Sequence, residues 1–161
     1  MTRLIGWLLA LLCCWYGAQP AVRTDAALTE FQYSHSGMDM SQIYCYSVRA
    51  EGGRLLADFD LYCAYEIRDV ALDAEDAAAL RALIYECDLW SWNGFSRSSS
   101  DVLDGEWFSL SAAFGDGTQL SASGSNAFPK GYREGAAEIR GFFEDMMEKH
   151  GVLLEAGLVF D

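Results

Sequence analysis

Apolar and polar side chains alternate in three stretches that begin near Leu28, and each stretch predicts a β-strand. Alternation is clear over residues 31–35 and 43–48, and a third stretch runs from Leu55 to Tyr65. Gly52-Gly53 lies between the last two and predicts a two-residue hairpin loop. This loop sets a register in which the apolar side chains of both strands share one face. The facing pairs are Tyr44 and Leu61, Tyr46 and Phe59, and Val48 and Ala57. We predict a meander of three antiparallel strands.

The apolar spacing changes to a helical period after this meander. Asp73 is a typical N-cap residue and Asp76 stands at the third helical position, so the pair predicts a capping box at the start of a helix over residues 74–87. The apolar residues that mark one face of this helix are Leu80, Leu83, Ile84 and Cys87. Because carboxylates are favourable in the first turn of a helix, we interpret Glu75 and Asp76 as helix-start residues and not as a catalytic pair.

A second hairpin is predicted over residues 107–124. Only a three-residue loop, Gly115-Asp116-Gly117, places apolar residues opposite apolar residues across its two strands. The predicted pairs are Phe108 and Gly124, Leu110 and Ala122, Ala112 and Leu120, and Phe114 and Thr118. In such a loop the last glycine takes a left-handed conformation, so we expect a positive φ at Gly117.

A second helix is predicted over residues 132–150. Its apolar residues recur at helical spacing, and Gly151 is a candidate C-terminal cap. Lys149 and His150 fall in its last turn, where cations are favourable, so we interpret His150 as a helix-end residue and not as a ligand. The elements follow the order βββ-α-ββ-α. This order predicts an α+β fold, a two-layer sandwich with an antiparallel sheet of about five strands and two helices.

The N-terminal segment predicts export. Arg3 precedes an apolar run over residues 4–18, which is typical of a secretory signal peptide. The charge-free stretch over residues 4–22 has 19 residues, close to the roughly 20 that a membrane-crossing helix needs, so a retained anchor stays open. Lipid attachment at Cys13 or Cys14 is a third alternative. We expect a signal peptide or membrane anchor over residues 1–21, a single α+β domain over 28–150 and an apolar C-terminal tail over 151–161. The protein is then extracytoplasmic, secreted or anchored at the cell membrane.

Charge and composition narrow the classes of partner. The chain has 24 acidic residues against 11 Lys and Arg, which gives a formal net charge of -13. Such a chain repels a phosphate backbone, so we expect no nucleic-acid partner. It also repels an anionic membrane surface, so membrane contact is expected only through the N-terminal segment. An aromatic content of 14% with two prolines excludes collagen-like and disordered classes.

Several spaced sequence pieces resemble a known pattern. These pieces are Trp92-Asn93-Gly94-Phe95, Val102-Leu103-Asp104-Gly105, Phe108-Ser109-Leu110, Asp116-Gly117-Thr118, Ala122-Ser123-Gly124 and Phe128-Pro129-Lys130-Gly131-Tyr132. Together they resemble a family of small uncharacterised exported or lipoprotein-like proteins of intestinal bacteria, over about residues 28–150. The resemblance implies an exported protein and assigns no activity to any residue.

The sequence contains none of the common catalytic or nucleotide-binding motifs. HExxH, GxxxxGK[ST], GxGxxG, GxSxG and CxxC are all absent. A hydrolytic triad would have to use His35 or His150, and neither stands in a recognisable setting. We therefore predict no catalytic residue and no cofactor, and a hydrolase without a local motif stays as an alternative.

Four aromatic residues around the loop over residues 90–105 form a candidate ligand-binding set. These residues are Trp90, Trp92, Phe95 and Trp107. Exposed aromatic rings beside carboxylates can stack on sugars or hold a peptide. The alternative, which we favour, is that they form a small core that orders the long loop.

Carboxylates in the same loop form a weak candidate metal site. Asp101, Asp104 and Glu106 lie close together in the sequence, and hard cations prefer such oxygen ligands. Calcium loops of known type spread their ligands over more residues. We therefore favour a solvated turn in which Asp104 caps its own backbone.

Three cysteines follow the N-terminal segment, so at most one intrachain disulfide can form among them. The predicted hairpin register directs Cys63 to the core face of the sheet, where Cys87 of the first helix also points, and directs Cys45 to the opposite face. Cys63 and Cys87 are therefore the candidate pair. The alternative that we favour is that both are small buried apolar side chains.

These observations favour a non-catalytic exported domain that binds a protein or glycan partner at the cell envelope. The alternatives are a structural or inhibitor-like secreted protein and an undetected hydrolase. An exposed apolar patch that includes the tryptophans would favour binding, whereas a closed pocket that holds His35 beside a carboxylate would favour catalysis.

Overall fold

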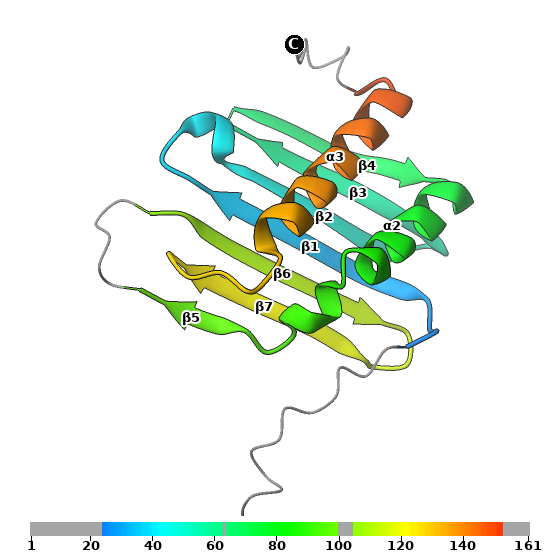
Figure 1. Cartoon of the computed structure of the whole chain (residues 1–161). Coiled ribbons are helices and arrows are strands. Elements are labelled where there is room, and N and C mark those ends of the chain that lie inside the picture. The colour runs from blue at the N-terminus through cyan, green and yellow to red at the C-terminus, as the bar shows by residue number, and fades with distance from the viewer. Residues whose placement is uncertain (1–23, 63, 100–104, 153–161) are drawn as a thin grey trace, which may run out of the picture.

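The computed structural model describes residues 24–62, 64–99 and 105–152. Within these ranges seven strands form one sheet in the order β4-β3-β2-β1-β6-β7-β5, and the two α-helices lie on one face of it (Figure 1). The strands are β1 (Leu28–Ser36), β2 (Tyr44–Glu51), β3 (Arg54–Leu61), β4 (Tyr65–Leu72), β5 (Ser96–Ser98), β6 (Trp107–Phe114) and β7 (Gln119–Ser125). The helices are α2 (Ala74–Glu86) and α3 (Tyr132–Lys149), with short 3₁₀ helices η1 (Met40–Gln42) and η2 (Leu89–Trp92).

The prediction of about five antiparallel strands is wrong. The sheet has seven strands and is mixed, because β5 runs parallel to β7. The third predicted strand ends at Leu61, and Tyr62, with a φ of 57°, turns the chain into β4. The sequence pattern does not reveal β4 because this edge strand buries only Val70 and Leu72, and exposed charged side chains interrupt the rest of it. It does not reveal β5 because all three residues of that strand are exposed and polar.

Both predicted hairpin registers are confirmed. Across β2 and β3, the pairs are Tyr44 and Leu61, Tyr46 and Phe59, and Val48 and Ala57. Across β6 and β7, they are Phe108 and Gly124, Leu110 and Ala122, and Ala112 and Leu120. Gly117 has a φ of 84°, as the three-residue loop requires. Strand β1 then lies between β2 and β6 and joins the two hairpins into one sheet.

The predicted helices are present, and each ends one residue before its predicted end. The Asp73 carboxylate accepts a hydrogen bond from the Asp76 N–H at 2.9 Å, and the Asp76 carboxylate accepts one from the Asp73 N–H at 3.1 Å. These two bonds form the predicted capping box of α2. His150 caps the C-terminus of α3, and Gly151 follows with a φ of 71°. The local sequence therefore specifies where α2 begins and where α3 stops.

Helix α3 packs its apolar face on the centre of the sheet. Phe143 is fully buried there, and its ring centroid lies 4.6 Å from that of Tyr46 and 5.7 Å from that of Phe31. Burial of one such aromatic side chain stabilises the fold by about 1.5–3 kcal/mol. The core consequently lies between the helices and one face of the sheet.

The opposite face of the sheet carries mainly polar side chains, as the period of two along each strand requires. Cys45 lies on this face, which confirms its predicted direction. Its cross-strand neighbours are Ser34 and Asp60, and the Ser34 hydroxyl donates to the Cys45 sulfur at 3.1 Å.

A β-bulge interrupts the edge strand β4. The pairing with β3 shifts between Ala57 and Phe59, and Asp69 takes a φ of 60°. The Asp69 N–H donates to the Asp58 carboxylate at 2.8 Å, and Arg49 pairs with the carboxylates of both aspartates. Side chains of β2 and β3 therefore hold the bulge in place.

Candidate functional site

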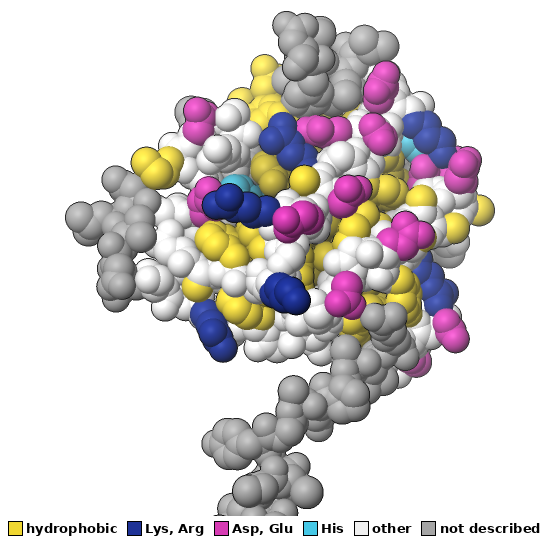
Figure 2. All heavy atoms as spheres, in the orientation of Figure 1, with side chains coloured by type: hydrophobic (Ala, Val, Ile, Leu, Met, Phe, Trp, Pro, Cys, Tyr) yellow, Lys and Arg dark blue, Asp and Glu magenta, His cyan; other side chains and the backbone are white. Residues whose placement is uncertain are grey.

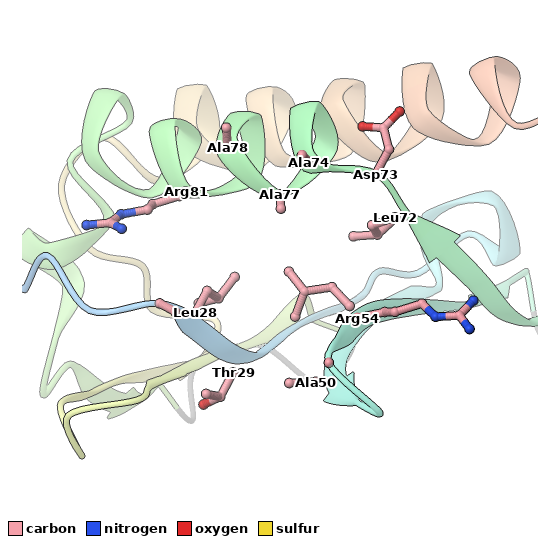
Figure 3. Close-up of a pocket in the computed structure, with 13 residues that line it drawn as sticks. Leu28, Thr29, Ala50, Arg54, Leu72, Asp73, Ala74, Ala77, Ala78 and Arg81 are labelled. Atoms are coloured by element: carbon pink, nitrogen blue, oxygen red, sulfur yellow. The ribbon is translucent and has the colours of Figure 1, made fainter.

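A groove of about 680 Å³ lies between helix α2 and the ends of the first three strands (Figure 3). A volume of roughly 300–1,000 Å³ is usual for sites that bind small molecules. The lining residues are Ala27, Leu28, Thr29, Ala50, Gly53, Arg54, Leu55, Leu72, Asp73, Ala74, Ala77, Ala78 and Arg81. Most of them are apolar, so the groove offers an apolar interior with charged residues at its rim.

Small side chains on α2 keep the groove open. Ala74, Ala77 and Arg81 follow the i, i+3, i+7 spacing of one helical face, and Ala77 points into the groove in Figure 3. Leu28 and Leu72 also point into it, from the start of β1 and the end of β4. Larger residues at the alanine positions would fill this space, as side chains in protein interiors normally do. The groove therefore results from the alanine content of α2.

Two arginines lie at opposite ends of the groove (Figure 3). At one end, the Arg81 guanidinium lies 3.3 Å from the Asp25 carboxylate and 3.4 Å from the carbonyl oxygen of Thr24. At the other end, Arg54 is exposed and has no hydrogen-bond or ion-pair partner within the described ranges. Figure 2 shows the helix-bearing face of the molecule, where acidic and basic side chains are interspersed and apolar side chains are visible between them.

An ion-pair cluster beside the groove joins the start of α2 to the end of α3. The Lys149 ammonium lies 2.8 Å from one carboxylate oxygen of Asp73 and 2.8 Å from one of Asp76. The His150 Nε2 lies 2.8 Å from the other carboxylate oxygen of Asp76, which is buried. We call these four residues the helix clasp. It holds the first turn of α2 above the groove.

The helix clasp perturbs the acidity of its members. The hydrogen bond from Lys149 and the bond from the Asp76 N–H lower the pKa of Asp73 to about 2. Burial raises the pKa of Asp76, but the hydrogen bonds from Lys149, His150 and the Asp73 N–H together lower it by more than burial raises it. The net shift of the Asp76 pKa is therefore downward. The two carboxylates in turn raise the pKa of Lys149. All of these shifts favour the charged forms, so the clasp is an ionic contact at neutral pH.

The structure does not bring the four predicted aromatic residues together on the surface. Trp90 and Trp92 are each 1% exposed, and Trp90 stacks on Phe114 with a centroid separation of 5.4 Å. Helix η2 directs both indoles into the main core of the fold, so neither can stack on a ligand. That they order the long loop stays a prediction, because residues 100–104 lie outside the described ranges. Phe95 is half-buried, and Trp107 is 42% exposed.

The predicted metal site falls mostly outside the described residues. Asp101 and Asp104 lie there, and Glu106 is exposed. In the part of the chain that the structure describes, no three carboxylate, imidazole or thiol side chains gather as a metal site would require. Metal binding by these three residues stays a prediction.

The predicted cysteine pair is described only in part. Cys87 is half-buried, and burial raises the pKa of its thiol. Cys63 lies outside the described residues, so the pairing stays a prediction.

Each histidine has a contact that accounts for its position. The His35 Nδ1 lies 2.8 Å from the carbonyl oxygen of Gln42, and the imidazole stacks on Tyr44 with a centroid separation of 5.3 Å. His150 belongs to the helix clasp at the end of α3, which agrees with its interpretation as a helix-end residue.

Neither a protein-family model nor a curated protein matches the chain. The resemblance to the exported family of intestinal bacteria thus stays a prediction. Within the described ranges, no helix is both long and apolar enough to cross a membrane. The predicted N-terminal segment over residues 1–21 and the part of the tail after Val152 lie outside those ranges.

The hydrophobic pattern along the chain does not predict the groove. One signal was present, because Ala74, Ala77 and Ala78 form a second helical stripe beside the apolar face of α2. Alanine is also the strongest helix former, so the same residues are equally consistent with an ordinary solvent-facing surface. Only the position of Leu28 and Leu72 opposite this stripe makes it one wall of a groove.

Proposed function

We propose that the protein is an exported, non-catalytic binding module that takes an apolar group of its ligand into the groove beneath α2. The observation that carries this proposal is an open apolar volume of about 680 Å³ next to a close-packed core. Apolar surface left in contact with water is unfavourable, so a groove of this kind favours an apolar occupant. The predicted signal or anchor segment supports a place at the cell envelope.

The polar residues that line the groove support binding over catalysis. The Thr29 hydroxyl donates to the carbonyl oxygen of Ala113 at 3.0 Å, and the Asp73 carboxylate accepts from Lys149 at 2.8 Å. Both side chains point away from the groove in Figure 3. A hydrolytic reaction needs a nucleophile and a base within hydrogen-bond reach of each other and of the substrate. The orientation of Thr29 and Asp73 therefore favours a site that holds a ligand without transforming it.

A pair of substitutions on α2 tests this proposal. Ala77→Phe fills the groove, whereas Ala79→Phe places the same side chain on an exposed position that does not line it. The probe is N-phenyl-1-naphthylamine, an uncharged apolar fluorophore. We expect the wild-type protein and Ala79→Phe to bind it equally, and Ala77→Phe to bind it at least about tenfold more weakly. Circular dichroism confirms that each variant is folded. Ala50→Phe, at an exposed lining position on β2, serves as a second groove-filling variant.

Two outcomes would contradict the proposal. The first is a wild-type protein that does not enhance the fluorescence of the probe. The second is equal binding by the wild type, Ala77→Phe and Ala50→Phe, which would place the probe elsewhere on the molecule.

The exposure of Trp107 favours a second candidate function, the binding of a glycan. Its cross-strand neighbours are Ser36 and Ser125, and a shallow cleft beside it is lined by the backbone and side chains of β5 and β7. An indole flanked by hydroxyls can stack on a sugar ring while the hydroxyls exchange hydrogen bonds with it. Screening against a glycan array with wild type and Trp107→Ala tests this candidate. Loss of glycan signals in the variant supports it, and identical signals contradict it.

A further inference from the structure

We infer that the apolar C-terminal tail is the resting occupant of the groove beneath α2, and that a ligand binds there by displacing it. The part of the tail that we assign to the groove lies within residues 153–161, which follow the last described residue, Val152. This inference rests on the proposed binding function of the groove and adds its regulation, because the protein then carries its own competitor for the site.

The end of α3 lies beside one end of the groove. Leu72 and Asp73 mark this end in Figure 3, and Arg81 marks the other. The Lys149 ammonium lies 2.8 Å from the Asp73 carboxylate, so the last turn of α3 is one ion pair away from a residue that lines the groove. Val152 follows shortly after and packs against the core. The helix clasp therefore fixes the point from which the tail starts, next to the Asp73 end of the groove.

The sequence after Val152 is long enough to cover the whole groove. Residues 153–161 follow Val152, and an extended chain of that length spans about 30 Å. The wall that α2 forms from Ala74 to Arg81 is about 10 Å long, at a rise of about 1.5 Å per residue. About 20 Å of chain is thus left to pass the start of α2 before the last residues of the tail enter the groove.

The N-terminal side of the chain supplies no comparable segment after export. The described chain begins at Thr24, whose carbonyl oxygen contacts Arg81 at the far end of the groove. The predicted signal cleavage leaves only Val22 and Arg23 before Thr24. Such a short segment cannot fill the groove. We therefore assign the groove to the C-terminal tail.

The tail carries the apolar side chains that such a groove favours. Leu158, Val159 and Phe160 form an apolar run near its end, and Leu153 and Leu154 stand at its start. In an extended chain every second side chain points to the same side, so Leu158 and Phe160 can enter the groove together. The removal of these side chains and of the groove walls from water favours the contact.

The open mouth of the groove allows a peptide to bind without losing its backbone hydrogen bonds. Ala50 and Ala78 line the groove and are exposed, so they lie at its mouth. Leucine and alanine side chains point into the groove in Figure 3, and these offer no hydrogen-bond partner. A backbone held at the mouth keeps its N–H and C=O groups in water, whereas a backbone laid deep along the walls would leave them unpaired at a high cost. We therefore place Leu158 and Phe160 inside the groove and the backbone of the tail at its mouth.

The tether makes the tail an effective competitor even if its intrinsic affinity is low. A segment joined to the chain next to its site has a local concentration in the millimolar range. The affinity for a ligand then falls in proportion to the fraction of molecules whose groove is free. Occupancy of roughly two-thirds of the molecules weakens ligand binding about threefold, and occupancy of roughly nine-tenths weakens it about tenfold.

Photo-cross-linking locates the tail. The photoreactive amino acid p-benzoylphenylalanine replaces Phe160 in the full chain, which is exported by a secreting host and irradiated, and mass spectrometry identifies the linked peptides. We expect links within one molecule to the residues that line the groove, over 27–29, 50–55 and 72–81. Ala77→Phe fills the groove and should abolish these links. Ala79→Phe places the same side chain on an exposed position outside the groove and should keep them.

The binding of N-phenyl-1-naphthylamine measures the competition. The double variant Leu158→Asp, Phe160→Asp removes the apolar side chains that we place in the groove. The double variant Ala156→Asp, Gly157→Asp is the matched control, because it adds the same charge and keeps every large apolar side chain of the tail. We expect the first variant to bind the fluorophore about three- to tenfold more tightly than the wild type, and the control to bind it like the wild type.

The outcomes separate this inference from the function on which it rests. Failure of both the wild type and the Leu158→Asp, Phe160→Asp variant to bind the fluorophore overturns the proposed function itself. Fluorophore binding with equal affinity in these two proteins overturns only the tail as a competitor. Links from position 160 to residues outside the groove, or to a second molecule in a cross-linked dimer, assign the tail to another surface and also overturn the inference.

Discussion

Removal of the Asp76 carboxylate should weaken the fold more than any other single change in the first turn of α2. The side chain is buried and accepts bonds from Lys149, His150 and the Asp73 N–H. Loss of the capping bond costs about 1 kcal/mol. Each bond to a charged group adds about 1.5–3 kcal/mol when it is fully buried. Lys149 is partly exposed and keeps its contact with Asp73, so we discount its share and expect a total loss of about 2–3 kcal/mol for Asp76→Ala.

Urea unfolding measures this loss through the fluorescence of the buried tryptophans. The unfolding midpoints of wild type and Asp76→Ala are compared at equal slope. Glu75→Ala is the matched control, because Glu75 is in the same turn, is exposed and only approaches Lys149 at 3.8 Å. A surface substitution of this kind changes the free energy of unfolding by no more than about 0.5 kcal/mol. Equal losses for the two variants would refute the role of the helix clasp.

The difference in stability between the wild type and Asp76→Ala should depend on pH. The pKa of Asp76 is lower in the folded protein than in the unfolded chain, because its hydrogen bonds outweigh its burial. The Asp76 carboxylate therefore makes its full contribution to folding stability above its pKa in the unfolded chain, about 3.9. This contribution is lost as the pH falls through its lower pKa in the folded protein. The difference in stability between wild type and Asp76→Ala should narrow in strong acid. A constant difference from neutral pH into that range would contradict this account.

Three further predictions concern other parts of the chain. Gly117→Ala should lower the free energy of unfolding by about 1 kcal/mol or more, because Gly117 has a positive φ. Gly115→Ala should lower it less in the same urea assay, because a Cβ atom at Gly115 makes only an ordinary van der Waals contact. Tyr33→Phe should lower the free energy of unfolding by about 1 kcal/mol, because it removes the hydrogen bond between the buried Tyr33 and Tyr132 hydroxyls, which lie 3.0 Å apart. In a double-mutant cycle, Tyr132→Phe should destabilise the Tyr33→Phe variant less than it destabilises the wild type. Expression of the full chain in a secreting host should yield a product that begins near residue 22 or 23, and an intact mass that includes residues 1–18 would contradict the signal peptide.

Local chemistry made part of this fold predictable. A two-residue glycine loop and a three-residue loop ending in Gly117 each allow one register that matches apolar faces, and both registers are present. The capping box of α2 is likewise a property of four consecutive residues that begin at Asp73. In these cases the interacting residues are close in the sequence, so their spacing carries the information.

Contacts between distant residues were not predictable in this way. Strand β5 pairs with β7, which is distant in the sequence, and its exposed serines and Arg97 give no apolar pattern. The burial of Trp90 and Trp92 depends on where η2 meets β6 and α3, as their contacts with Phe114 and Tyr132 show. The groove depends on small alanine side chains on α2, a pattern that an ordinary solvent-facing helix surface also shows. The aromatic residues were therefore easy to identify as a group, but their division between core and surface was not.

The bulge in β4 has a consequence for behaviour at high protein concentration. An outer strand with free N–H and C=O groups is a template on which a second molecule can add a strand and begin aggregation. In β4 the left-handed Asp69 breaks the regular row of these groups, and its own N–H is already bonded to Asp58. The strand at the opposite edge, β5, has only three residues, too few to guide a long added strand. Both borders of the sheet are thus poor templates for fibril growth.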